Sequence, residues 1–189
     1  MGHHGDQRDR IERLALLDLD PRELRIRLVR QLRAVVAFDA YAWLMIDPLS
    51  LVGTAPLVDV PVPRPLAAHV PDYIRTKYLT PVNRWTTLLA DARRTATLVE
   101  ATGGELSRSL MWREVQQRLG VVDVATVVFA DRFGCWANLD LWRIRPAPQF
   151  RRAELRFLES VATTITAGLR ACLASELPPF VRRLPSLVC

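Results

Sequence analysis

The chain has 189 residues, of which half are hydrophobic and 24% are charged, a composition that excludes a disordered chain and fits one globular domain. Its formal charge of +6 comes from arginines spread along the chain, with Lys77 as the only lysine, whereas a nucleic-acid-binding surface usually gathers basic and aromatic residues in one patch. The three cysteines form no C-x-x-C motif, and neither a membrane-length apolar run nor a signal peptide is visible, so we expect a cytoplasmic protein without disulfides or a membrane span.

The predicted elements begin with helices. Residues 11–19 form a short helical stretch within an N-terminal extension over 1–19. The next helix is predicted over 20–37, because Asp20 is a good N-cap and Pro21 suits the first helical position. Its apolar residues recur at helical spacing and form one stripe: Leu24, Leu28, Leu32, Val35 and Val36.

The middle of the chain alternates strands with short helices, separated by proline and glycine breaks. The predicted elements are a strand over 40–47, its antiparallel partner over 51–61, a helix over about 67–78, a loop or short strand over 80–88, a strand over 95–101 and a helix over 105–120. Pro56 within the second of these strands predicts an edge position or a bulge.

The clearest signal is a hairpin over 122–144, where two β-rich runs flank a tight turn at 131–134. A long amphipathic helix over 151–177 and a proline-broken tail over 178–189 follow. Because hairpins dominate, we expect an α+β fold with a central antiparallel sheet, and the domain is predicted to span 20–177.

The strand over 135–142 has two faces of different character, since side chains alternate along a strand. One face is small and aliphatic and suits helix packing: Cys135, Ala137, Leu139 and Leu141. The other is aromatic and polar: Trp136, Asn138, Asp140 and Trp142. We assign the large residues of the first strand to this second face: Tyr41, Trp43 and Met45. Such a face is typical of a small-molecule cavity; the alternative is a core filled by the aromatic rings, with the polar residues at its wet rim.

The sequence contains no recognisable catalytic or metal-binding pattern. The histidines lie near the N-terminus or beside a proline: His3, His4 and His69. Without a positioned histidine, a Cys/His cluster or a glycine-rich phosphate loop, we expect no catalytic residue, metal or cofactor. Cys135 is expected to be a small buried hydrophobe, with redox chemistry as the alternative. Arg84, beside Trp85, could clamp an acidic ligand or lie in solvent.

Three segments resemble the N-terminal GAF-type sensor domain of bacterial LuxR-type helix-turn-helix transcriptional regulators: 31–61 (QLRAVVAFDAYAWLMIDPLSLVGTAPLVDVP), 74–88 (IRTKYLTPVNRWTTL) and 121–143 (VVDVATVVFADRFGCWANLDLWR). The resemblance spans about residues 25–173. It implies a GAF/PAS-like antiparallel sheet with N- and C-terminal helices on one face and connecting helices over a pocket on the other. The DNA-binding module of that family is longer than residues 178–189, so we expect a fragment or truncated form of a regulator, or a stand-alone GAF protein.

The sequence thus predicts a non-catalytic, ligand-sensing regulatory domain that signals through its terminal helices. The partners expected are a small-molecule ligand and a second copy of the chain, with DNA bound only through a helix-turn-helix module outside these residues. The predicted pocket residues are Tyr41, Trp43, Arg84, Trp85, Trp136, Asn138, Asp140 and Trp142. The alternatives are a redox-active GAF enzyme that uses Cys135 and a ligand-free dimerisation or interaction module.

Overall fold

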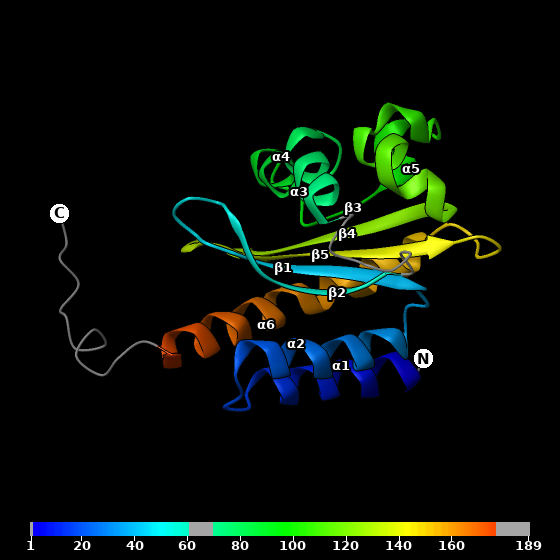
Figure 1. Ribbon diagram of the computed structural model, residues 1–189. Coiled ribbons are helices and arrows are strands. Elements are labelled where there is room, and N and C mark those ends of the chain that lie inside the picture. Colours follow the sequence, from blue (N-terminus) through cyan, green and yellow to red (C-terminus); the bar gives the residue numbers. More distant parts are fainter. Residues whose placement is uncertain (1, 61–69, 177–189) are drawn as a thin grey trace.

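The computed structural model describes residues 2–60 and 70–176, and its centre is a five-stranded antiparallel sheet (Figure 1). The strand order is β2-β1-β5-β4-β3, with β1 at Ala40–Ile46, β2 at Gly53–Asp59, β3 at Thr95–Thr97, β4 at Val121–Asp131 and β5 at Gly134–Ile144. The predicted α+β class with a central antiparallel sheet is therefore confirmed. The predicted tail 178–189, His69 and the start of the helix predicted over 67–78 lie outside the described residues.

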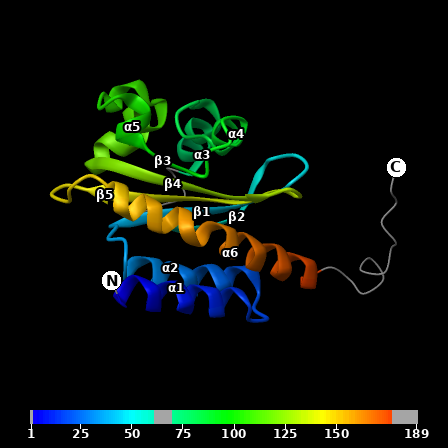
Figure 2. The ribbon, with the colours of Figure 1, turned by 180° about the vertical axis from the view of Figure 1, so that it is seen from behind.

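Helices cover both faces of the sheet (Figures 1 and 2). On one face lie α1 (Gly2–Ala15), α2 (Pro21–Arg33) and the long α6 (Arg152–Glu176). On the other lie α3 (Val70–Leu79), α4 (Trp85–Ala90), α5 (Leu98–Thr102) and three short helices that are not α-helical, η2 (Leu106–Arg108), η3 (Trp112–Gln116) and η4 (Gln117–Leu119). The arrangement matches the prediction of terminal helices on one face and connecting helices on the other.

The start of α2 is capped by Asp20, as the sequence predicts. The Asp20 carboxylate accepts the backbone N–H groups of Arg22 and Glu23 at 2.9 and 3.0 Å, and so satisfies two donors at the helix start. The basic residue that interrupts the apolar stripe, Arg25, is 2% exposed. Its guanidinium donates to the carbonyls of Pro21 (3.0 Å), Trp43 (3.2 Å) and Ala55 (2.7 Å), and so ties α2 to β1 and to the neighbouring edge strand β2.

Three connecting segments differ from the prediction. The helix expected over 105–120 is divided into η2, η3 and η4, and the strand expected over 95–101 becomes the short β3 followed by α5. The strand stops because Thr97 caps α5, with its hydroxyl oxygen accepting the Glu100 N–H at 3.1 Å. Within 80–88, α4 begins at Trp85 where a loop or short strand was expected.

Two cores result, one on each face of the sheet. The larger lies between the sheet and α1, α2 and α6, and includes Leu139 and Leu141 of β5 with Leu158 and Ile165 of α6. Smaller clusters on the opposite face lie under the connecting helices. None of the helices within the described residues is long and apolar enough to cross a bilayer.

Candidate ligand-binding site

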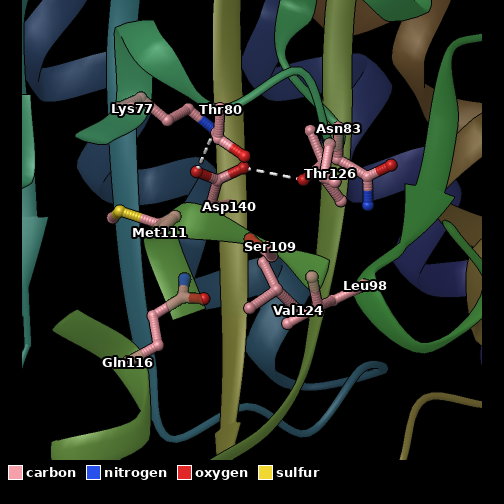
Figure 3. A pocket seen from close by; sticks show the side chains of 11 residues that line it. Lys77, Thr80, Asn83, Leu98, Ser109, Met111, Gln116, Val124, Thr126 and Asp140 are labelled. Carbon is pink, nitrogen blue, oxygen red and sulfur yellow. Dashed lines mark hydrogen bonds and ion pairs between the residues drawn. The ribbon is translucent and has the colours of Figure 1, made fainter. Parts of the chain in front are cut away.

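A small polar cavity lies between the sheet and the connecting helices, on the face opposite α6 (Figure 3). Its volume is about 20 Å³, which is room for about one water molecule with the side chains as they stand. The side chains that line it come from α3, the 80–83 loop, α5, the 109–116 segment and the hairpin: Lys77, Thr80, Val82, Asn83, Leu98, Ser109, Met111, Gln116, Val124, Thr126 and Asp140.

A buried ion pair forms one wall of the cavity. The Nζ atom of Lys77 lies 2.5 Å from Oδ2 of Asp140, and the two side chains are 6% and 4% exposed. The other carboxylate oxygen accepts the Thr126 hydroxyl at 2.8 Å and, at a longer 3.4 Å, the side-chain amide of Asn138. Three donors thus surround one carboxylate, which is what a buried charge requires.

The hairpin register explains how these groups meet. Thr126 of β4 pairs directly with Asp140 of β5, so the two side chains lie on the same face of the sheet. Lys77 reaches them from the last turn of α3, and its ammonium lies 5.9 Å from the centroid of the Trp85 ring. The ammonium is a compact point charge that can carry three donors into a narrow site, unlike the planar guanidinium that the chain uses elsewhere.

Several buried polar atoms around this pair have no hydrogen-bond partner within residues 2–60 and 70–176. Of the seven such side-chain atoms among the described residues, five are here: Tyr73 Oη, Thr80 Oγ1, Asn83 Nδ2, Asn138 Oδ1 and Trp142 Nε1. Thr80 and Asn83 line the cavity directly. Buried polar groups in folded proteins are nearly always satisfied, so a cluster of unsatisfied atoms points to a ligand or ordered water at this place.

The electrostatics keep Tyr73 neutral. Burial, and then the nearby Asp140 carboxylate, raise the pKa of Tyr73 well above its ordinary value of 10.0. The residue as a whole is only partly buried, but its hydroxyl oxygen is inaccessible to solvent. Its ring packs against Trp142 with a centroid separation of 6.1 Å, so these two aromatics form the end of the site away from Trp85.

Four of the predicted pocket residues lie on this side of the sheet. Asp140 lines the cavity, and Asn138 is hydrogen-bonded to it. Trp142 clusters with the lining residues Leu98, Met111 and Val124. Trp85 covers the site beside Lys77. Asn138 and Asp140 are 0% and 3% exposed, so they lie in the interior and not at a wet rim.

The prediction is wrong for Tyr41 and Trp43, which face the opposite side of the sheet. Tyr41 pairs with Leu141, and Trp43 with Leu139, so they share the aliphatic face. Trp43 stacks on Phe129 in the core against α2 and α6, with ring centroids 5.3 Å apart. Alternation sorts the residues of one strand into two sets, but only the pairing register shows which set faces which side.

A second correction concerns the start of β5, where the register with β4 is irregular between Phe129 and Ala130. Such a bulge reverses the alternation that follows from a regular strand. The Trp136 indole donates to Asp131 at 3.0 Å, and the same carboxylate pairs with Arg170 of α6, so Trp136 is outside the cavity. Cys135 packs instead in the cluster with Trp85, on the face opposite α6.

The surroundings of Arg84 and Cys135 bear on two further expectations. Arg84 precedes α4 and donates to the Tyr78 carbonyl and the Thr86 hydroxyl, each at 2.7 Å, so it stabilises the loop and is absent from the cavity lining. Burial raises the pKa of Cys135 to about 11, which leaves a thiol that is a poor nucleophile at neutral pH. The described residues contain no group of three His, Cys, Asp or Glu side chains that could hold a metal ion.

The residues that sequence reasoning missed are Lys77, Thr80, Asn83 and Thr126. Lys77 carried a signal, because it is the single lysine among 26 basic residues. Thr126 could have been found by pairing the two arms of the hairpin about its turn. Thr80 and Asn83 carried no signal, since they sit in a loop whose path only the packed structure defines.

No protein-family model matches the chain, and no curated protein sequence matches it. Solved structures do match in fold. A GAF domain/HD domain protein from Geobacter sulfurreducens aligns over 85% of this chain and 97% of its own, at 16% identity and a TM-score of 0.57. The GAF domain of an Acinetobacter phosphoenolpyruvate-protein phosphotransferase aligns over 94% of this chain and 98% of its own, at 13% identity and a TM-score of 0.56. The chromophore-binding domain of an unusual bacteriophytochrome from R. palustris aligns over 90% of this chain and 61% of its own, at 14% identity and a TM-score of 0.55.

These similarities agree with the sheet order and with helices on both faces of the sheet. At such low identities they establish the fold and not the ligand. The chain therefore has the fold of a GAF domain.

Proposed function

We propose that this chain is a ligand-sensing domain that binds a small molecule in the cavity beside Lys77 and Asp140 and does no chemistry of its own. The observation that carries the proposal is the cluster of five buried, unpartnered polar atoms around one balanced ion pair. Leaving such groups unsatisfied costs stability, so their presence is better explained by a ligand that completes their hydrogen bonds than by packing alone. One structural neighbour is described as a chromophore-binding domain, which supports the choice of a binding role for this fold.

The route by which binding would be transmitted runs through β5. Asp140 faces the cavity, while its neighbours Leu139 and Leu141 face the opposite core. That core also contains Leu158 and Ile165 of α6. A ligand that shifts Lys77 and Asp140 would therefore displace the strand against α6, and the helix would carry the change to a following domain. Such coupling requires that the ligand binds the two arrangements with different affinities.

The finer parts of the proposal come from the sequence resemblance. We infer a cytoplasmic regulator of the LuxR type, in which the DNA-binding module lies outside these residues and the chain pairs with a second copy through its terminal helices. Light scattering on the purified chain tests the pairing, and a monomer at high micromolar concentration would contradict it.

A second candidate function is a ligand-free interaction module. The observation in its favour is the cavity volume of about 20 Å³, which is small for a binding pocket. The two candidates differ in whether any small molecule stabilises the domain.

A thermal-shift screen with a library of small polar metabolites separates the two. A ligand at 100 times its Kd stabilises the folded state by about 2.7 kcal/mol, which raises the Tm of a domain of this size by roughly 5–11 °C. The Val124→Ile variant adds one methylene to the cavity wall and should reduce the shift, whereas Val52→Ile, at a site 46% exposed, should not. A screen without any stabilising compound would favour the interaction module.

A further inference from the structure

The cavity contains one charge of each sign, and the two neutralise each other. Among the residues that line it, Lys77 and Asp140 are the charged ones, and they form a direct ion pair at 2.5 Å. A charged ligand would have to break this pair or add an unbalanced charge beside two side chains that are only 6% and 4% exposed. Either event is unfavourable, because a desolvated charge without a partner is costly. The site is therefore electrostatically matched to an uncharged ligand.

The free hydrogen-bonding atoms show what this uncharged molecule must offer. Thr80 and Asn83 line the cavity, and among the described residues Thr80 Oγ1 and Asn83 Nδ2 find no partner. The amide nitrogen of Asn83 can only donate. Beside the ion pair, Asn138 Oδ1 is a buried acceptor without a donor. A ligand that complements this set has a carbonyl-type acceptor and an N–H donor but no net charge.

We propose that the ligand is a small uncharged carbonyl compound of the carboxamide type, with its carbonyl oxygen accepting from Asn83 and Thr80. This inference rests on the proposed ligand-sensing function and names the chemical class of the ligand. Entry requires more than the present 20 Å³. Entry would therefore displace Met111, whose unbranched side chain lines the cavity and adapts to gaps, and would release the Thr76 hydroxyl that bonds its sulfur at 2.9 Å.

The test compares amides with acids of the same shape. Acetamide and propionamide are titrated into the ¹⁵N-labelled full chain, alongside acetate and propionate at matched pH and ionic strength. The readout is the side-chain amide signals of Asn83 and Asn138 and the indole N–H signal of Trp142, because each of these side chains carries one of the unpartnered atoms of the site. We expect saturable shifts with the amides and binding at least about tenfold weaker with the acids, because only the acids bring an unbalanced charge.

Variants locate the binding at the cavity. Thr80→Val removes one hydroxyl at nearly constant shape and should weaken amide binding by about 2- to 10-fold, the effect of one hydrogen bond. Thr163→Val makes the same change on an exposed position of α6 and should leave binding unchanged. Asn83→Gly is a second site variant, chosen because the backbone φ of 50° at this position suits glycine.

The outcomes separate this inference from the proposed function. Amide binding that Thr80→Val weakens and Thr163→Val does not would support both. Acids that bind as tightly as amides would overturn the uncharged class while retaining a ligand-sensing cavity. Absence of any saturable shift with the amides would also overturn the carboxamide class, and the metabolite screen would then decide the proposed function independently.

Discussion

Replacement of Lys77 by methionine should destabilise the domain by about 3–5 kcal/mol, the usual cost of leaving one member of a buried ion pair alone. At 2.5 Å and an effective dielectric constant of about 20, the attraction between Lys77 and Asp140 amounts to about 7 kcal/mol. Desolvation of the two charges offsets much of this attraction in the native protein. The variant keeps the desolvation of Asp140 but loses its counterion, and only the bonds from Thr126 and Asn138 remain.

The same helix provides a matched control. Arg75 of α3 pairs with Glu114 at 3.0 Å, but the two side chains are 59% and 37% exposed. In water the attraction is about 1 kcal/mol before the entropy of ordering both side chains is subtracted, so Arg75→Met should change stability by at most about 1 kcal/mol. The pair of variants thus compares loss of a buried cation with loss of an exposed one on the same helix.

The assay is urea unfolding at pH 7, followed by circular dichroism and tryptophan fluorescence, with the m-value checked for constancy. The double variant Lys77→Met with Asp140→Asn should recover part of the lost stability, since it removes the unpaired carboxylate charge. A loss below about 1 kcal/mol for Lys77→Met, equal to that of Arg75→Met, would refute the conclusion that the pair is buried and structurally coupled.

Three further predictions test other parts of the structure. Cys135 should resist alkylation by iodoacetamide at pH 8 in the folded chain, since a pKa of about 11 leaves roughly one thiolate in a thousand. Mass spectrometry showing rapid labelling at this residue would contradict this and favour the redox alternative. Tyr73→Phe should reduce the alkaline loss of stability. Because the pKa of this tyrosine is raised in the folded chain, the unfolded chain loses the proton first as the pH rises. The stability that this hydroxyl contributes below pH 10 is therefore lost above it. Between pH 9 and 11, the free energy of unfolding from urea titrations should fall by about 1.4 kcal/mol more for the wild type than for the variant. Gly168→Ala should loosen the packing of α1 on α6, because the new Cβ would lie 2.8 Å from the Ala15 carbonyl oxygen. The measurement is amide hydrogen exchange in α1, which should become faster. Unchanged exchange would contradict this close packing.

Much of the fold could be predicted because it depends on neighbours in sequence. The Asp20 cap, the stripe of α2 and the alternation along β5 are set by residues within a few positions of one another. The structure retains the first two, and it retains the alternation from Ala137 onward, beyond the bulge. Asn138, Asp140 and Trp142 were placed on the correct face for this reason. The division of 105–120 into short helices that are not α-helical was not predictable, because packing against α3 and the sheet overrides local helical propensity there.

The site itself depended on contacts between distant segments. Asp140 is 63 positions from Lys77, and the sequence offers no rule that brings them together. The mistaken faces of Tyr41 and Trp43 have the same origin, since only the pairing of β1 with β5 shows which side of the sheet each residue faces. The sequence by itself therefore determined the terminal helices, the hairpin and the two faces of β5 beyond its bulge, because capping and alternation act locally. Only the tertiary structure decided the cavity, because register, a bulge and the approach of α3 are properties of strands and helices already packed together.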